Sequence, residues 1–408
     1  MKILHTSDWH VGRTIRGRSR SDEHVAVLAE IAAIARREAV DVVLVVGDLF
    51  DSAAPTAESE QIVYRALLEL AATGATVIVL AGNHDNARRL QAVEPVLELG
   101  QIITRAGFRP AEDGGVVEVA SRDGSERAKV AALPFLSQRW VVKADDLMAE
   151  GRGATENSQS YDARVRVLLA ALTDGFGPNT VNLVAAHLTT SGGRMGGGER
   201  MAQSIFEYEV NALGFPANAH YVALGHLHRR QQVPGPGQIH YCGSPLQLDF
   251  GETSDIKAVV VVEAHPGVPA KVRDVTLTAG RRLRRVTGTM EALRALAAGT
   301  EPADDAYLTV MVQEPARVGL ADEVRELFPY CVDVVVERAD QAKPSGRASD
   351  GPTRAQRPPG ELFGEYLRDQ QVEDPALTDL FGQLLEAVGD APDQADPDAG
   401  LLPAAGVA

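Results

Sequence analysis

The chain has 408 residues, of which 45% are hydrophobic, and a formal net charge of −16 at pH 7. This length favours two or three domains with packed cores. No run approaches the 18 apolar residues of a membrane span, and the apolar stretch at the start is too short for a signal peptide. Cys242 and Cys331 are expected to be reduced packing residues. We therefore expect a cytoplasmic protein without a membrane partner.

The acidic charge is concentrated towards the C-terminal end of the chain. Residues 361–408 carry eleven acidic side chains and one basic side chain, Arg368. This segment accounts for most of the net charge, and an aspartate-rich metal site is itself negative until cations bind. The overall sign of the charge therefore does not exclude DNA as a partner.

Apolar strands alternate with amphipathic helices in the first 80 residues. The expected elements are strands over 2–6, 41–46 and 75–80, and helices over 22–37 and 56–72. Ser21 or Asp22 is the expected N-cap of the first helix. This order indicates parallel strands joined by right-handed crossovers.

A second group of elements follows. Short strands and turns are expected from 101 to 132, then a helix over 161–172 and strands over 181–186, 221–224, 238–242 and 257–263. We assign these strands to a second sheet. Two sheets with helices outside give an α/β fold, a four-layer α-β-β-α sandwich over residues 1–275.

The pattern changes near residue 276. The expected elements are β-α-β-α-β over 283–287, 290–298, 306–312, 320–327 and 332–337. They predict a small α/β domain over 276–338, followed by a polar linker over 339–360. Residues 361–390 are expected to form C-terminal helices, and residues 391–408 a disordered tail.

Residues of the metal-binding type lie in five short islands, each at the end of a predicted strand. The islands are Asp8-Trp9-His10, Gly47-Asp48-Leu49-Phe50-Asp51, Gly82-Asn83-His84-Asp85, His187 and Gly225-His226-Leu227-His228. Parallel strands bring their carboxyl ends to one edge, where open α/β sheets bind ligands. We expect Asp8 and His10 to alternate along an extended segment and to share one face, and likewise His226 and His228.

This set of side chains suits two divalent cations that share one carboxylate. Such a two-metal site can hydrolyse a phosphate ester. The first cation is assigned to Asp8, His10, Asp48 and His228, and the second to Asp48, Asn83, His187 and His226. Asp48 is expected to place one oxygen on each cation. The mixed oxygen and nitrogen donors favour Mn²⁺, with Fe²⁺ and Zn²⁺ as alternatives.

Other polar residues in the islands have predicted supporting roles. His84 is the candidate catalytic residue that gives a proton or a hydrogen bond to the leaving oxygen. Asp51 and Asp85 are candidates for orienting the histidines. Trp9 is interpreted as packing behind the site rather than stacking on a base. The histidines interpreted as structural are His5, His24, His220, His240 and His265.

The order of these motifs resembles the calcineurin-like metallophosphoesterase superfamily. The segments 7–12, 47–51, 81–85, 224–228 and 241–247 further resemble the SbcD family of double-strand-break repair nucleases, over residues 1–340. The resemblance implies a Mn²⁺-dependent nuclease in DNA repair, recombination and replication. Its expected activities are 3′→5′ exonuclease on double-stranded DNA and endonuclease on single strands and hairpins, with His84 contacting the scissile phosphate.

The resemblance also implies partners. These are an SbcC-type coiled-coil ATPase and a second copy of the chain, as a homodimer within a heterotetramer, with residues 276–338 as a capping domain. One alternative is a small-molecule phosphodiesterase of the same superfamily, which would lack the capping domain and the helices after 360. The other alternative is a non-catalytic scaffold, but the complete set of predicted metal ligands argues against it.

Contacts to DNA and to the ATPase are predicted from residue type and position. The arginines after the islands expected to contact phosphates are Arg13, Arg16, Arg88, Arg89, Arg229 and Arg230. Any one of them taken alone also fits a solvated surface charge. The residues expected to grip the ATPase are Leu362, Phe363, Tyr366, Leu367, Leu380, Phe381 and Leu384. The glycine-rich loop over 192–198 fits a flexible substrate loop or a simple connection.

Overall fold

The computed structural model describes residues 1–137, 154–196, 209–299 and 305–336, together with Phe363, Leu367 and Leu377. Residues 1–339 form one compact unit. Within the described residues, no helix is both long and apolar enough to cross a membrane. The predicted linker, most of residues 361–390 and the tail over 391–408 lie outside the described part. Phe363, Leu367 and Leu377 are helical.

The first sheet carries the strands predicted near the N-terminus. Its order is β16-β15-β1-β4-β5-β6. The strands are β1 (Lys2–Thr6), β4 (Val42–Val46), β5 (Thr76–Leu80), β6 (Ile102–Arg105), β15 (Ala258–His265) and β16 (Val268–Thr276). β1, β4 and β5 run parallel, as predicted, and β6 continues the sheet in parallel beside β5. Their carboxyl ends therefore meet at one edge.

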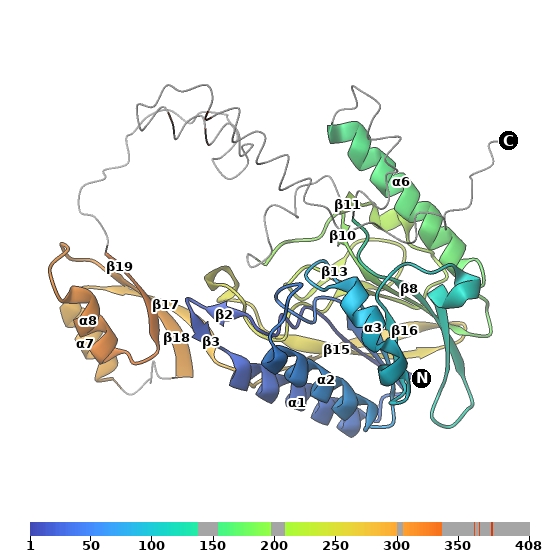
Figure 1. Ribbon diagram of the computed structural model, residues 1–408, viewed down its shortest axis with the longest axis horizontal. Coiled ribbons are helices and arrows are strands. Elements are labelled where there is room, and N and C mark those ends of the chain that lie inside the picture. The colour runs from blue at the N-terminus through green and yellow to red at the C-terminus, as the bar shows by residue number, and fades with distance from the viewer. Residues whose placement is uncertain are drawn as a thin grey trace. The chain divides into compact units, whose positions relative to one another are not determined.

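Helices cover the outer face of this sheet (Figure 1). They are α1 (Ser21–Glu38), α2 (Ala57–Ala71) and α3 (Ala87–Glu98). Thr56 caps α2 by accepting a hydrogen bond from the amide of Ser59. The predicted cap of α1 is wrong, because Arg20 takes the N-cap position without a capping side chain. Its buried guanidinium binds Glu23 instead.

The second sheet has the order β13-β14-β12-β9-β8-β7. Its strands are β7 (Val116–Ala120), β8 (Arg127–Leu133), β9 (Val181–His187), β12 (Tyr221–Gly225), β13 (Gln231–Val233) and β14 (Ile239–Tyr241). One apolar core lies between the two sheets, and another lies between the second sheet and α6 (Ala154–Thr173). The predicted four-layer sandwich is confirmed (Figure 1).

β6 and β15 are in the first sheet, although the sequence pattern assigned both segments to the second. The sequence pattern places residues 257–263 in the second sheet, but β15 pairs antiparallel with β1 of the first sheet, with Lys2 opposite Glu263. Val259 faces the helix-covered core and Val260 faces the core between the sheets. A strand buried on both faces is apolar throughout, so its sequence does not indicate which sheet it joins.

A third sheet, β17 (Arg282–Gly288), β18 (Ala306–Val312) and β19 (Cys331–Val336), is parallel and packs on α7 (Met290–Ala297) and α8 (Leu320–Leu327). The β-α-β-α-β order is as predicted. A separate capping domain over 276–338 stays a prediction.

The remaining short elements are β2 (Thr14–Ile15), β3 (Arg18–Ser19), β10 (Thr189–Thr190), β11 (Glu209–Val210), η1 (Ala111–Gly115), η3 (Ala212–Gly214) and η4 (Phe250–Glu252).

Several single-residue interpretations can be compared with the structure. Trp9 is fully buried, and its indole N–H donates to the Thr6 hydroxyl over 3.0 Å, as expected of a packing residue. Cys242 and Cys331 are free and buried. His5 is buried with its ring Nδ1 2.9 Å from the Tyr221 hydroxyl.

We expect His24 to make folding stability depend on pH. Its ring is fully buried, and its Nδ1–H donates to the Arg20 carbonyl over 3.0 Å. Burial, and then the charge of Arg20, lower the pKa of His24 to about 4. The unfolded chain therefore binds this proton more tightly. The stabilisation is complete above about pH 6.5 and is lost as the pH falls towards 4, by on the order of 2 kcal/mol at pH 5.

Urea unfolding of the metal-free chain at pH 7.5 and pH 5 measures this effect. His24→Gln removes the titrating ring, so the variant should lose less stability between the two pH values than the parent chain. Equal losses in both proteins would show that the pH dependence arises elsewhere.

Candidate metal centre

The five islands lie at the carboxyl ends of strands from both sheets. Asp8 follows β1, Asp48 follows β4 and Asn83 follows β5, all in the first sheet, while His187 ends β9 and His226 follows β12 in the second. Strands β12 and β4 contact each other across the interior, as do β9 and β4. The two sheets thus present their ligand-type residues to one another at one end of the sandwich.

One group contains Asp8, His10 and His228. Their ligand-type atoms lie within 4.8 Å of one another, and all three residues are buried. The Nε2 atoms of His10 and His228 are 3.1 Å apart. Both imidazoles therefore direct the same ring nitrogen to one point.

The other group contains Asp48, His187 and His226, again within 4.8 Å. The side-chain oxygen of Asn83 joins them, at 3.0 Å from His187 Nε2 and 2.8 Å from His226 Nδ1. The seven predicted ligands thus fall into two adjacent groups of mixed oxygen and nitrogen donors, a composition that suits divalent transition-metal ions.

Asp48 lies between the two groups. Its Oδ2 is 3.6 Å from His10 Nε2 and 3.5 Å from His187 Nε2, so one oxygen reaches both. The other oxygen, Oδ1, accepts the backbone N–H of His84 over 2.8 Å. One oxygen of Asp48 on each cation stays a prediction. Burial disfavours the charged carboxylate, but His187 and His10 outweigh it and hold the pKa of Asp48 well below its usual value.

The backbone at the ligands is not extended, which corrects the predicted alternation. Asp8, His10, Asp48 and His226 have φ values of 54°, 48°, 52° and 103°. Such conformations cost about 1–3 kcal/mol each for residues other than glycine. Hydrogen bonds between the islands hold them. The Asp8 N–H donates to the Gly47 carbonyl, and the His226 N–H donates to Asp8 Oδ1 over 2.9 Å.

Glycines permit the close approach of the islands. A Cβ on Gly82 would lie 2.1 Å from Asp48 Oδ1. One on Gly225 would lie 1.9 Å from the Val46 carbonyl oxygen, and one on Gly47 would lie 2.2 Å from His187 Nδ1. These short distances explain why a glycine precedes the ligand-type residue in three of the islands.

Comparison with known proteins identifies the family. Residues 1–230 match the family model described as calcineurin-like phosphoesterase. The SbcD component of nuclease SbcCD from Bacillus subtilis (strain 168) is 35% identical over 285 residues, covering 69% of this chain and 71% of that protein. The Escherichia coli (strain K12) protein of the same name is 30% identical over 314 residues, covering 72% and 73%. The chain belongs to the SbcD family. The family consists of nuclease subunits, so the chain is a metal-dependent phosphodiester hydrolase.

The ligand-type histidines of this SbcD-family site have partners at their other ring nitrogen. His187 Nδ1 donates to the Val46 carbonyl over 2.9 Å. Asp51, predicted to orient a histidine, has its Oδ1 3.5 Å from His10 Nδ1. His228 Nδ1 is 3.3 Å from Glu252 Oε1. The hydrogen bonds of His187 and His228 fix the tautomer of each ring and aim its Nε2 into the site.

Two neighbours of the histidines were missed by sequence reasoning. Glu252 comes from the short turn η4, which has no ligand spacing. Phe135 follows β8 and stacks on His226, with ring centroids 6.5 Å apart and planes 21° apart. Neither carries a sequence signal, because each reaches the site only through the fold.

Asp85 has a different role from the one predicted. Its carboxylate accepts the backbone N–H groups of Gly82 (2.8 Å), Phe50 (3.1 Å) and Leu49 (3.2 Å). These partners are amides rather than imidazoles, so Asp85 joins the second and third islands. Burial, and then the charge of Asp48, raise the pKa of Asp85 to about 6.

His84 lies beside the first group, with its ring centroid 4.7 Å from that of His10. It is buried, and its Nδ1–H donates to the Asp51 carbonyl over 2.9 Å. This bond fixes the ring next to the two groups of ligand-type residues. The position suits the predicted contact with a leaving oxygen.

Most of the predicted DNA-binding arginines already have a carboxylate partner. The pairs are Arg13–Asp51 (3.2 Å), Arg16–Asp333 (3.3 Å), Arg89–Glu60 (2.8 Å), Arg229–Asp255 (3.3 Å) and Arg230–Asp274 (2.7 Å). Arg88 is exposed in the first turn of α3. A phosphate would therefore compete with an internal carboxylate at five of these positions.

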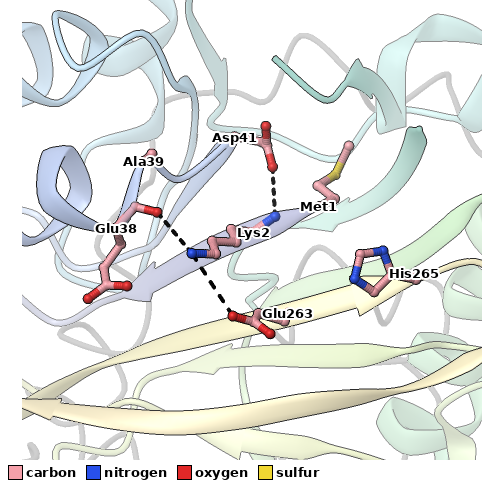
Figure 2. A pocket seen from close by; sticks show the side chains of 7 residues that line it. All are labelled: Met1, Lys2, Glu38, Ala39, Asp41, Glu263 and His265. Atoms are coloured by element: carbon pink, nitrogen blue, oxygen red, sulfur yellow. Dashed lines mark hydrogen bonds and ion pairs between the residues drawn. The ribbon is translucent and has the colours of Figure 1, made fainter. Parts of the chain in front are cut away.

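A pocket lies at the opposite, amino end of β1 (Figure 2). The Lys2 N–H donates to Asp41 Oδ2 over 2.7 Å, while the Lys2 ammonium lies 3.4 Å from the Glu38 carbonyl oxygen and 4.0 Å from Glu263. Figure 2 shows these contacts of Lys2. None of the residues that line this pocket belongs to the five islands.

Proposed function

We propose that this chain is the nuclease subunit of an SbcC–SbcD-type complex and cleaves DNA phosphodiester bonds with two divalent cations, Mn²⁺ being the expected ion. The observation that carries the proposal is the position of Asp48 Oδ2 between two groups of imidazoles. A single shared carboxylate between two donor sets is the arrangement of two-metal hydrolases.

The assignment of the cations follows the two groups. Asp8, His10, Asp48 and His228 would hold the first, and Asp48, Asn83, His187 and His226 the second. When bound, such cations polarise a phosphate and lower the pKa of a coordinated water.

The chain's own residues have two further tasks. His84, held by the Asp51 carbonyl, donates a proton or hydrogen bond from its ring to the leaving oxygen. The burial of the ligands excludes bulk water and strengthens the electrostatic interactions at the phosphate.

Family membership supports DNA as the substrate. The proposed activities are 3′→5′ exonuclease action on double strands and endonuclease action on single strands and hairpins. The proposed location is the cytoplasm. Arg88 is exposed near the third island and is one of the arginines proposed to contact phosphates. A labelled DNA hairpin and a chromogenic phosphodiester, each incubated with Mn²⁺, test the substrate class. Cleavage of the hairpin supports the proposal, whereas turnover of the small ester with intact DNA would favour a small-molecule phosphodiesterase.

We also propose that two copies of the chain form a homodimer through helices of the nuclease domain, within a heterotetramer. Leu68 of α2, with Val96 and Leu99 at the end of α3, are 52%, 69% and 87% exposed. Leu68 approaches Gly100, which follows α3, so we assign the three exposed apolar side chains to one surface. Such surfaces mark protein contacts. Sedimentation of the parent chain and of Leu99→Glu tests this. A monomer in both cases would contradict it.

Removal of residues 361–408 should abolish binding to the coiled-coil ATPase, because the predicted gripping face lies there. Mn²⁺-dependent cleavage of single strands should persist, since the ligands lie between residues 8 and 228. Affinity co-purification and a single-strand digest measure the two properties. Co-purification of the shortened chain with the ATPase would place the contact elsewhere.

A further inference from the structure

Glu252 is a fully buried carboxylate outside the predicted ligand set. It ends the turn η4. Its Oε1 lies 3.3 Å from His228 Nδ1, and its Oε2 accepts from the Lys257 ammonium over 2.7 Å and from the Leu248 N–H over 3.1 Å. The carboxylate thus joins a ligand-type histidine to a buried cation.

Lys257 holds the same histidine from the other side. Its ammonium donates to the His228 carbonyl over 3.0 Å and to the Ser244 hydroxyl over 2.9 Å. The ring of His228 is therefore fixed by Glu252 and its backbone by Lys257. An ion pair that served only to stabilise the fold would not need to contact both the ring and the backbone carbonyl of the same histidine.

The turn that carries Glu252 is itself anchored. The side-chain amide of Gln247 donates to the carbonyls of Glu252 (2.9 Å) and Thr253 (3.2 Å). Its oxygen accepts the N–H of Leu283, in β17, over 2.7 Å. Glu252 is thus tied to the third sheet and cannot easily follow a displaced imidazole.

Two physical principles favour a role for Glu252 in positioning His228 over a role in the stability of the fold. A buried ion pair contributes little net stability compared with apolar residues of the same size. A carboxylate that accepts the distal N–H of a ligating histidine, by contrast, sets its tautomer and raises its basicity. The charge of the carboxylate strengthens this hydrogen bond.

We propose that Glu252 is a positioning residue that aims His228 Nε2 at the first cation, with Lys257 as its counter-charge. The inference rests on the proposed function in requiring cations at these residues. It adds a connection from the metal centre through Gln247 to the third sheet.

Titration of the full chain with Mn²⁺ alone, followed by calorimetry and by electron paramagnetic resonance, tests the inference. Glu252→Gln keeps a neutral acceptor but removes the charge. One of the two Mn²⁺ sites should weaken about 10- to 100-fold, the range for partners of metal ligands, while the other is retained. Circular dichroism establishes that the variant is folded.

Glu94→Gln is the matched control. Glu94 is a buried carboxylate paired with Arg105 (3.3 Å) and Arg109 (2.7 Å), away from the ligands. Its replacement should leave both Mn²⁺ affinities unchanged. A folded Glu252→Gln protein that binds two Mn²⁺ as tightly as the parent would overturn the inference and leave the metal centre intact.

Glu252→Gln leaves Lys257 without its carboxylate and can therefore unfold the chain. The double variant Glu252→Gln/Lys257→Met removes both charges, and the same weakened site is expected. Parent-like binding in the double variant would also overturn the inference. If the parent chain binds fewer than two Mn²⁺, the proposed function itself fails, which is a distinct result.

Discussion

Replacement of Asp48 with asparagine should abolish cleavage and the binding of a cation pair. The new side chain can still accept the His84 N–H through its oxygen, as Asp48 Oδ1 does. Its NH₂ group then stands where Oδ2 lies, 3.6 Å from His10 Nε2 and 3.5 Å from His187 Nε2, and presents a donor to both groups. Loss of several kcal/mol of charge stabilisation corresponds to a fall of about 10³-fold or more in the rate.

Metal analysis of the purified Asp48→Asn variant and a Mn²⁺-dependent digest of a DNA hairpin measure these effects. Asp41→Asn is the matched control, because Asp41 precedes the same strand, β4, and accepts the Lys2 and Arg122 amides at its far end. It should retain both metal and activity. Normal activity of the Asp48→Asn variant would remove Asp48 from its bridging role.

Replacement of His84 with alanine should lower the cleavage rate by about 10²- to 10⁴-fold, the range of general acid catalysis. Two Mn²⁺ should still bind, since the proposed ligands are all retained. The distinction matters because a His84 nitrogen lies within 4.8 Å of ligand-type atoms of His10 and Asp48. The position alone is compatible with a ligand or with a proton donor.

Single-turnover cleavage and Mn²⁺ stoichiometry, measured on the same sample, separate the two roles. His265→Ala serves as a control, since this ring is exposed and pairs with Glu126. Loss of one Mn²⁺ from the His84→Ala variant would make His84 a ligand. Unchanged cleavage would exclude it from the mechanism.

Much of the fold could be predicted because its strands and helices have clear periodicity. The run Val42–Val46 and the β-α-β-α-β order after residue 276 both appear as expected. The sheet of β15 could not be predicted, since a strand buried on both faces is uniformly apolar. Helix α3 was missed because Pro95 interrupts its pattern.

The candidate site shows a similar division. The grouping of residues from Asp8 to His228 could be predicted, because side chains of the metal-binding type occur at the end of several predicted strands. Backbone geometry could not be foreseen, since the positive φ of Asp8 and His10 depends on hydrogen bonds to the neighbouring loop. Glu252 was missed because only tertiary structure brings it to His228.

The arginines illustrate the limit of arguments from charge. Arg230 follows an island and fits a phosphate contact by sequence, yet Asp274, 44 residues later, lies 2.7 Å from it. Sequence proximity to a ligand does not reveal such a partner. Phosphate contacts therefore have to be measured one arginine at a time, from the salt dependence of DNA binding.

The central claim is that Asp48 joins two cations held by residues from both sheets. Anomalous diffraction from crystals of the chain grown with Mn²⁺ tests it most directly. We predict two peaks about 3.5–4 Å apart, as in two-metal hydrolases, with the Asp48 carboxylate between them. A single peak, or two peaks too distant to share that carboxylate, would contradict the account.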